Sequence, residues 1–172
     1  MIILLTGGSG CGKSTYAEKL IRRMPREKRV YIATMQVFDE ESVKRVERHR
    51  AQRADMNFET VECPMNLGNA DIAPGSTVLL EDLPNLLAGE MFSGGDPARI
   101  LPQLKALCGM CANLVIVTND VHSDGIRYEE LTREYQRLLA EINRGAAELA
   151  DAVVEIVYSI PVYLKGEAPC GL

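Results

Sequence analysis

Short apolar runs alternate with amphipathic stretches along the whole chain. Most of the apolar runs are continuous, which is typical of strands covered on both faces. They predict strands at residues 2–5, 30–33, 58–62, 77–81, 114–118 and 153–158. Between them, helical patterns predict helices over residues 13–24, 39–54, 84–92, 97–110 and 128–149. This alternation predicts an α/β fold with a mostly parallel central sheet and helices on both faces.

The composition is that of one ordinary globular domain spanning residues 1–172, with 47% hydrophobic and 25% charged residues. A formal net charge of −5 argues against nucleic-acid binding, because such proteins present a basic surface. No apolar run approaches the roughly 18 residues of a membrane span, and the N-terminus lacks the basic flank of a signal peptide. We therefore expect a cytoplasmic protein. Cys108 and Cys111 form a lone C-x-x-C, without the second pair that a zinc site would need.

A glycine-rich segment, GGSGCGKST, directly follows the first predicted strand. It fits the phosphate-loop pattern G-x-x-x-x-G-K-[ST], with a strand before it and a helix after it, so we expect a P-loop NTPase-like fold. Backbone N–H groups and the helix N-terminus of such a loop surround phosphates, Lys13 reaches the β- and γ-phosphates, and the Ser14 hydroxyl ligates Mg²⁺. The expected nucleotide-binding residues are Gly7, Gly8, Ser9, Gly10, Cys11, Gly12, Lys13 and Ser14, with Lys13 also catalytic.

A carboxylate that supports the magnesium ion is expected at the end of another core strand. Glu81 and Asp82, at the end of the strand predicted over 77–81, are the two candidates, and a solvated strand end is the alternative. The guanine-reading pattern N-K-x-D is not matched, since the nearest segment is TNDV at 118–121. A small-molecule or nucleotide kinase, or a related nucleotidyl transferase, is therefore favoured over a switch GTPase.

One histidine stands among four arginines in the segment RVERHRAQR, residues 45–53. On a helix, Arg45, His49 and Arg53 share one face because they are four residues apart. Guanidinium groups match phosphate oxygens, and their positive charge disfavours the protonated imidazole. A neutral His49 is able to attack phosphorus and form a phosphoramidate. The alternative is a solvated basic helix face with an incidental histidine.

Taken together, these segments resemble the bifunctional adenosylcobinamide kinase / adenosylcobinamide-phosphate guanylyltransferase family of cobalamin biosynthesis. The likeness runs nearly end to end, and its specific parts are the YIAT strand, the H-R-x-x-R helix and VTN after the fifth strand. The resemblance implies that ATP or GTP phosphorylates a corrinoid, adenosylcobinamide. It also implies that GMP from GTP then passes through a histidine, matched by His49, to give adenosylcobinamide-GDP.

Further contacts are implied by the resemblance alone. It implies a ring-like homotrimer, and a nucleotide contact for Glu81 that leaves Asp82 as the alternative metal partner beside Ser14. The nucleotide-binding positions that match the family outside the phosphate loop are Ala33, Thr34, Met35, Arg50, Ala51, Gln52, Arg53, Glu62 and Glu81.

The chain departs from the family pattern at three places. Ala54 follows Arg53 where the family tends to have proline, Phe58 replaces a tryptophan, and DVHSDGIR at 120–127 has one glycine fewer and no proline. That loop is expected to face the corrinoid, and His122 within it is interpreted as a surface residue. A small-molecule kinase without guanylyl transfer therefore stays the alternative, and a nucleotide-binding module without turnover is the third hypothesis.

Overall fold

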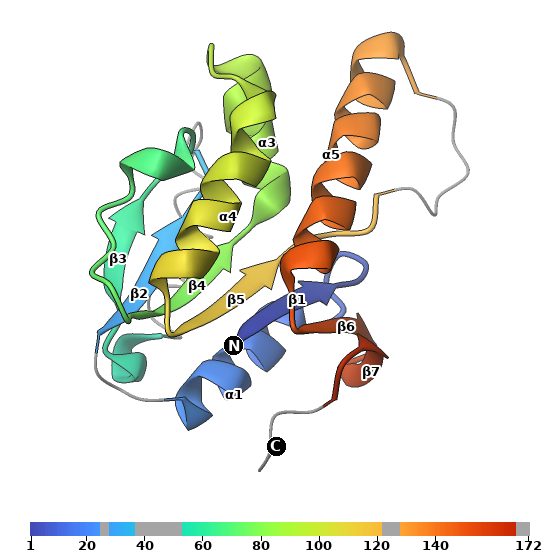
Figure 1. The fold of residues 1–172 in the computed structure, drawn as a ribbon. Helices are drawn as coiled ribbons and strands as arrows, with labels where there is room; N and C mark the ends of the chain where they lie inside the picture. Colours follow the sequence, from blue (N-terminus) through green and yellow to red (C-terminus); the bar gives the residue numbers. More distant parts are fainter. Residues whose placement is uncertain (25–27, 37–52, 122–127, 168–172) are drawn as a thin grey trace.

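The computed structural model describes residues 1–24, 28–36, 53–121 and 128–167 (Figure 1). Its central sheet has seven strands in the order β3-β2-β4-β5-β1-β6-β7. All neighbouring strands pair in parallel except β6 and β7, which are antiparallel, so the expected mostly parallel sheet is confirmed. The strands are β1 (Ile2–Thr6), β2 (Arg29–Ala33), β3 (Glu59–Glu62), β4 (Thr77–Glu81), β5 (Asn113–Val117), β6 (Ala152–Val157) and β7 (Ile160–Lys165).

Helices cover both faces of the sheet, as the alternation of elements predicts (Figure 1). On one face, Ile3 and Leu5 of β1 pack with residues of α1 (Lys13–Arg23). On the other, Leu4 packs in a core built with α3 (Leu83–Phe92), α4 (Ile100–Met110) and α5 (Glu130–Leu149). Successive strand residues point to opposite faces. Because both faces are buried, the inner strands β1, β4 and β5 carry continuous apolar runs instead of alternating ones.

Three segments differ from the sequence-based expectation. The helix predicted over 39–54 falls outside the described residues up to position 52. Its end is wrong, because Arg53 lies in a turn and Ala54–Met56 forms the 3-10 helix η1. Strand β7 was not predicted at all. The helix predicted over 97–110 begins as the 3-10 helix η3 (Pro97–Arg99), and a third 3-10 helix, η2 (Leu67–Asn69), lies in the connection after β3.

The register of the sheet aligns the carboxyl ends of its parallel strands. Leu5 pairs with Val117, Val117 with Glu81, Glu81 with Ala33, and Ala33 with Glu62. The segments that follow these strands therefore emerge along one edge of the sheet. In open α/β sheets, ligands bind along this edge.

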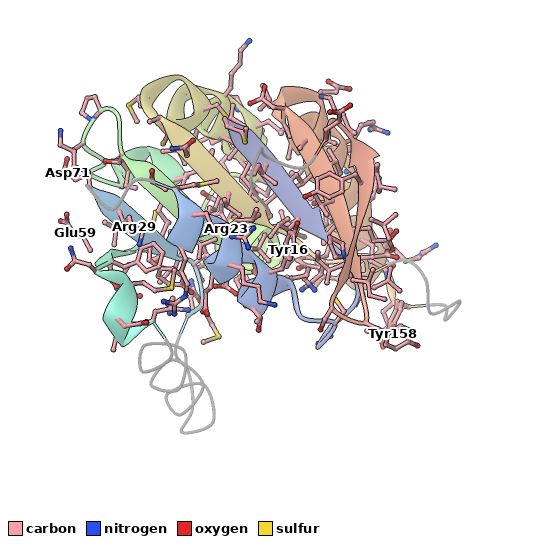
Figure 2. The ribbon with its side chains drawn as sticks, turned by 90° about the horizontal axis from the view of Figure 1, so that it is seen from below. Tyr16, Arg23, Arg29, Glu59, Asp71 and Tyr158 are labelled. Atoms are coloured by element: carbon pink, nitrogen blue, oxygen red, sulfur yellow. The ribbon has the colours of Figure 1, made fainter. Side chains whose placement is uncertain are left out.

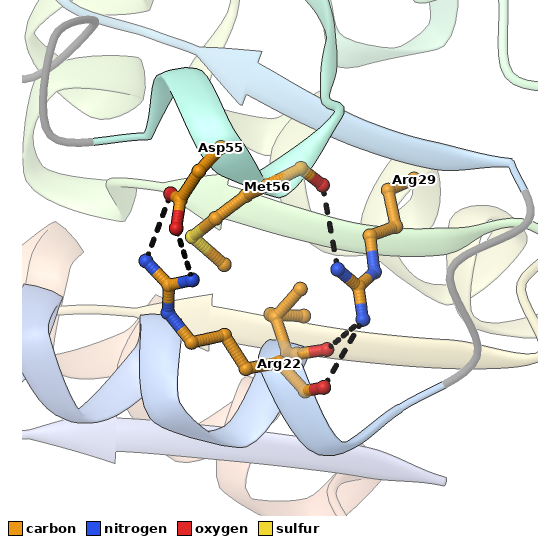
Figure 3. Close-up of polar contacts among 5 residues, drawn as sticks. Arg22, Arg29, Asp55 and Met56 are labelled. Atoms are coloured by element: carbon orange, nitrogen blue, oxygen red, sulfur yellow. Dashed lines mark hydrogen bonds and ion pairs between the residues drawn. The ribbon is translucent and has the colours of Figure 1, made fainter.

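Arg29 fastens the end of α1 to the segment that follows Arg53 (Figure 3). Its guanidinium is buried, and Nη2 donates to the backbone oxygens of Ile21 and Met24, each at 2.6 Å. Nη1 donates to the Met56 oxygen at 3.3 Å. An exposed bidentate pair between Arg22 and Asp55, at 2.7 and 3.0 Å, joins the same two elements. The position of η1 is thus fixed on α1.

Arg29→Met should lower the free energy of unfolding by about 2–4 kcal/mol, because it leaves buried carbonyl oxygens without a donor. Urea denaturation followed by circular dichroism measures this loss. The matched control is Arg22→Met, which removes only an exposed ion pair and should have a much smaller effect. Equal losses of stability in the two variants would contradict a stabilising role of the buried Arg29 hydrogen bonds.

Candidate active site

The glycine-rich segment 7–15 runs from the end of β1 into the start of α1, so its expected strand–loop–helix context is confirmed. Gly7 and Gly12 have φ angles of 138° and 101°, which side chains rarely adopt. A Cβ at Gly7 would lie 2.6 Å from the Ile156 oxygen, and one at Gly12 would lie 2.6 Å from Ser159 Oγ. Both glycines are therefore required by conformation and by close packing against the β6–β7 hairpin.

Lys13 is buried against the inside of this loop. Its ammonium donates to the backbone oxygens of Gly7 at 2.9 Å and Gly8 at 2.6 Å. The backbone N–H of Asp120 in turn donates to the Gly7 oxygen at 3.2 Å, which joins the segment after β5 to the loop. The positive charge of Lys13 is thus held against the backbone of the loop, and its contact with phosphate stays a prediction.

The side chains of Ser14, Tyr31 and Arg53 meet around the carboxylate of Glu81. We call these four residues the Glu81 cluster. The Ser14 hydroxyl donates to Glu81 Oε1, and the Tyr31 hydroxyl donates to Oε2 at 3.2 Å. Arg53 Nη1 lies 3.7 Å from the same Oε2, and the guanidinium carbon lies 3.7 Å from the centroid of the Tyr31 ring. The cluster joins the first turn of α1 to the residue that precedes η1.

Burial and the neighbouring Glu81 charge raise the pKa of Tyr31, so its hydroxyl keeps its proton and donates throughout the physiological pH range. The Phe58 ring also packs against Tyr31 in an edge-to-face arrangement, with 5.9 Å between the ring centroids. Arg53 is itself only 7% exposed. A buried guanidinium needs a partner, and here it has an anionic one and an aromatic one.

Asp82 has a different environment. Its Oδ1 accepts from the backbone N–H and from Nδ2 of Asn85, both at 2.8 Å, and so caps α3. Burial raises the pKa of Asp82 to about 6, against the opposing effect of these two hydrogen bonds. The Thr34 hydroxyl donates to the backbone oxygen of Asp82 at 2.8 Å and accepts from the backbone N–H of Asp82 at 2.7 Å. The proposed roles of Asp82 on the metal and of Thr34 on the nucleotide stay predictions.

The structure brings some of the predicted residues together and leaves others apart. The phosphate loop, Glu81 and Arg53 lie in contact, and Thr34 follows closely because its N–H donates to the Glu81 oxygen at 3.2 Å. Glu62 is separated from Glu81 by β2, at the edge of the sheet. His49, Arg50, Ala51 and Gln52 lie outside the described residues, as do Arg45 and His122. Tyr31 was missed, because a tyrosine inside a buried strand carries no signal besides that of a core residue.

Two further findings concern the described ranges of the chain. Within them, no group of three or more histidine, cysteine, aspartate or glutamate side chains is placed to hold a metal ion. None of the helices there combines the length and the apolar character that crossing a bilayer requires.

Residues 3–164 match the family described as cobinamide kinase / cobinamide phosphate guanyltransferase. The chain belongs to this family. Relatives named bifunctional adenosylcobalamin biosynthesis protein CobU, from Salmonella typhimurium and Escherichia coli, are each 33% identical over 184 residues, covering 96% of this chain and 100% of theirs. The similarly named CobP of Pseudomonas aeruginosa is 30% identical over 170 residues, covering 95% of this chain and 97% of the relative. The resemblance seen in the sequence is confirmed.

Solved structures support the fold of this family member. A KaiC-like protein from Pyrococcus horikoshii superimposes with a TM-score of 0.51 at 15% identity, covering 90% of this chain and 69% of the other. A second protein from that organism superimposes with a TM-score of 0.55 at 9% identity, covering 97% of this chain and 87% of the other. At these identities the likeness concerns the fold alone, and it agrees with a P-loop NTPase-like arrangement.

In this member of the cobinamide kinase family, the effects of Ser14→Ala and Glu81→Gln on the affinity for magnesium–GTP should not be additive. Ser14→Ala removes the donor of the Ser14–Glu81 bond and Glu81→Gln removes the charge of its acceptor. Both variants thus weaken the same contact, so the loss in magnesium–GTP affinity of the double variant should fall short of the sum by about 1 kcal/mol or more. Titration calorimetry on the four proteins measures the difference. The control is Glu90→Gln, since this buried carboxylate contacts the N–H groups of Asn66 and Asp96 and should add fully to Ser14→Ala. Full additivity of Ser14→Ala with Glu81→Gln would contradict the coupling.

Proposed function

We propose that this chain phosphorylates adenosylcobinamide with ATP or GTP and then transfers GMP from GTP to the product through a guanylyl-histidine on His49. Family membership supports the two reactions. The observation that carries the mechanism is the Glu81 cluster, because it ties Ser14 of the phosphate loop to Arg53, the last arginine of the histidine-bearing segment.

In the kinase step, the phosphate loop holds the triphosphate through its backbone N–H groups, the start of α1 and the ammonium of Lys13. The hydroxyl oxygen of adenosylcobinamide attacks the γ-phosphorus and gives up its proton, and the bond to the β-phosphate oxygen breaks. We propose that Lys13 neutralises the negative charge that moves onto the leaving nucleoside diphosphate.

The residues at the phosphate loop fit a magnesium ion. Mg²⁺ prefers oxygen ligands, and the Ser14 hydroxyl and the Glu81 carboxylate lie within hydrogen-bonding contact of one another. We propose Ser14 as a ligand and Glu81 as the nearer carboxylate partner, because the Ser14 hydroxyl contacts Glu81, whereas Asp82 Oδ1 caps α3. When bound there, the ion would supply positive charge that offsets the negative charge of the phosphates.

In the guanylyl step, a ring nitrogen of His49 attacks the α-phosphorus of GTP. A phosphorus–nitrogen bond forms, the bond to the β-phosphate oxygen breaks, and pyrophosphate leaves. A phosphate oxygen of the first product then attacks the same phosphorus and releases the histidine. His49 precedes Arg53 by four residues, and four residues of chain span at most about 14 Å. The contacts of Arg53 with Glu81 and Tyr31 therefore support a nucleophile close to the loop.

The proposal predicts that α-labelled GTP labels the protein covalently. The adduct should be acid-labile and alkali-stable, as expected of a phosphoramidate, and is measured by scintillation counting of denatured protein. His49→Ala should abolish the adduct but keep most of the kinase activity, and the control His122→Ala should keep both. Absence of an adduct in the wild-type protein, with kinase activity present, would instead establish a kinase without guanylyl transfer.

We also propose a homo-oligomer, by resemblance a trimer. Exposed apolar side chains gather on the antiparallel hairpin of β6 and β7, and such surfaces commonly bind other protein surfaces. They are Val157, Ile160, Val162 and Leu164. Sedimentation equilibrium tests this proposal, and a monomer at micromolar concentration would contradict it.

A further inference from the structure

We propose that Tyr158, in the turn of the β6–β7 hairpin, is the platform on which the base of the bound nucleotide stacks. The inference rests on the proposed nucleotide binding at the phosphate loop. It assigns a ligand contact to a residue in a hairpin that carries none of the motifs considered so far.

The hairpin turn is joined directly to the phosphate loop. The backbone N–H of Ser159 donates to the Cys11 backbone oxygen at 2.8 Å, and Ser159 Oγ lies 2.6 Å from the position that a Cβ on Gly12 would take. Farther along β7, the Tyr163 hydroxyl lies 2.8 Å from that of Tyr16 in α1, within hydrogen-bonding distance. The turn therefore keeps a fixed position beside the first residues of α1, where the phosphates of a nucleotide would be seated.

Tyr158 itself contacts little of the protein. Its side chain is 90% exposed, and Figure 2 shows it at the end of the molecule opposite Glu59 and Asp71. Tyr158 and Ser159 have φ angles of 49° and 67°, in the left-handed region. Two-residue turns of this kind strongly favour asparagine and glycine. A tyrosine here is thus costly in conformation and gains no burial inside the chain, which points to a role outside it.

A nucleobase matches this surface. The two sides of the phosphate loop differ, because Glu81, Tyr31 and Arg53 fill the side next to Ser14, whereas the hairpin side offers an exposed flat ring. The nucleoside lies outside the phosphate loop, beyond the α-phosphate. Stacking of its base on an aromatic ring removes apolar surface of both groups from water. Stacking accepts any base, which agrees with a site that uses ATP or GTP.

The test uses the full chain and a fluorescent variant. The protein has no tryptophan, so Tyr158→Trp introduces a single one. Its emission should be quenched when magnesium–GTP saturates the protein. Inorganic tripolyphosphate, which occupies the loop without a base, should not quench it. Unchanged emission at GTP concentrations that saturate binding, measured by equilibrium dialysis, would overturn the inference.

Affinities provide the second readout. Tyr158→Ala should weaken GTP and ATP binding by about 5-fold to 100-fold and leave tripolyphosphate affinity unchanged, while Tyr158→Phe keeps all three. The control is Phe92→Ala, which removes an exposed aromatic ring at the end of α3. Equal losses for GTP and tripolyphosphate, or no loss for GTP, would overturn the inference. A wild-type protein that binds no nucleotide would instead contradict the proposed function.

Discussion

The carboxylate of Glu81 is the point on which the arrangement of the site depends. It accepts the Ser14 hydroxyl from α1 and the Tyr31 hydroxyl from β2, and it pairs with the Arg53 guanidinium. Parallel pairing makes this possible, because the register places the end of β4 between Ala33 and Val117 at one edge of the sheet. A single side chain thereby connects the phosphate loop to the segment that carries the proposed nucleophile.

Charge placement explains why these contacts hold. In a chain with a net charge of −5, the described structure nevertheless buries Lys13, Arg29 and Arg53. Buried cations are stable only with partners, and each of the three has them: loop carbonyls, the end of α1, and the Glu81–Tyr31 pair. Arg29 contributes indirectly, since it fixes η1 and so the exit of the chain from Arg53. Two of these buried cations, Lys13 and Arg53, contact the phosphate loop and the carboxylate of Glu81.

Features encoded locally were predictable from the sequence, and those that depend on distant contacts were not. Continuous apolar runs and the glycine-rich segment 7–15 identify a parallel sheet and a phosphate loop, because each signal lies within a few residues. Strand β7 was missed because its turn, Tyr158-Ser159, lacks the usual asparagine and glycine, and Pro161 weakens the strand pattern. Tyr31 resembles any core residue in sequence. The turn at Arg53 depends on neighbours that only the folded chain brings together.

The central claim is that Arg53, held by Glu81 and Tyr31, brings a nucleophile to the α-phosphate of GTP bound on the loop. Exchange of labelled pyrophosphate into GTP, measured without any corrinoid, tests it most directly, because exchange requires reversible transfer of GMP to the protein. The account predicts exchange by the wild-type protein and at least a tenfold slower exchange by Arg53→Ala, taking about 1.4 kcal/mol as the smallest loss from breaking a buried charged contact. Wild-type exchange rates in Arg53→Ala would contradict it.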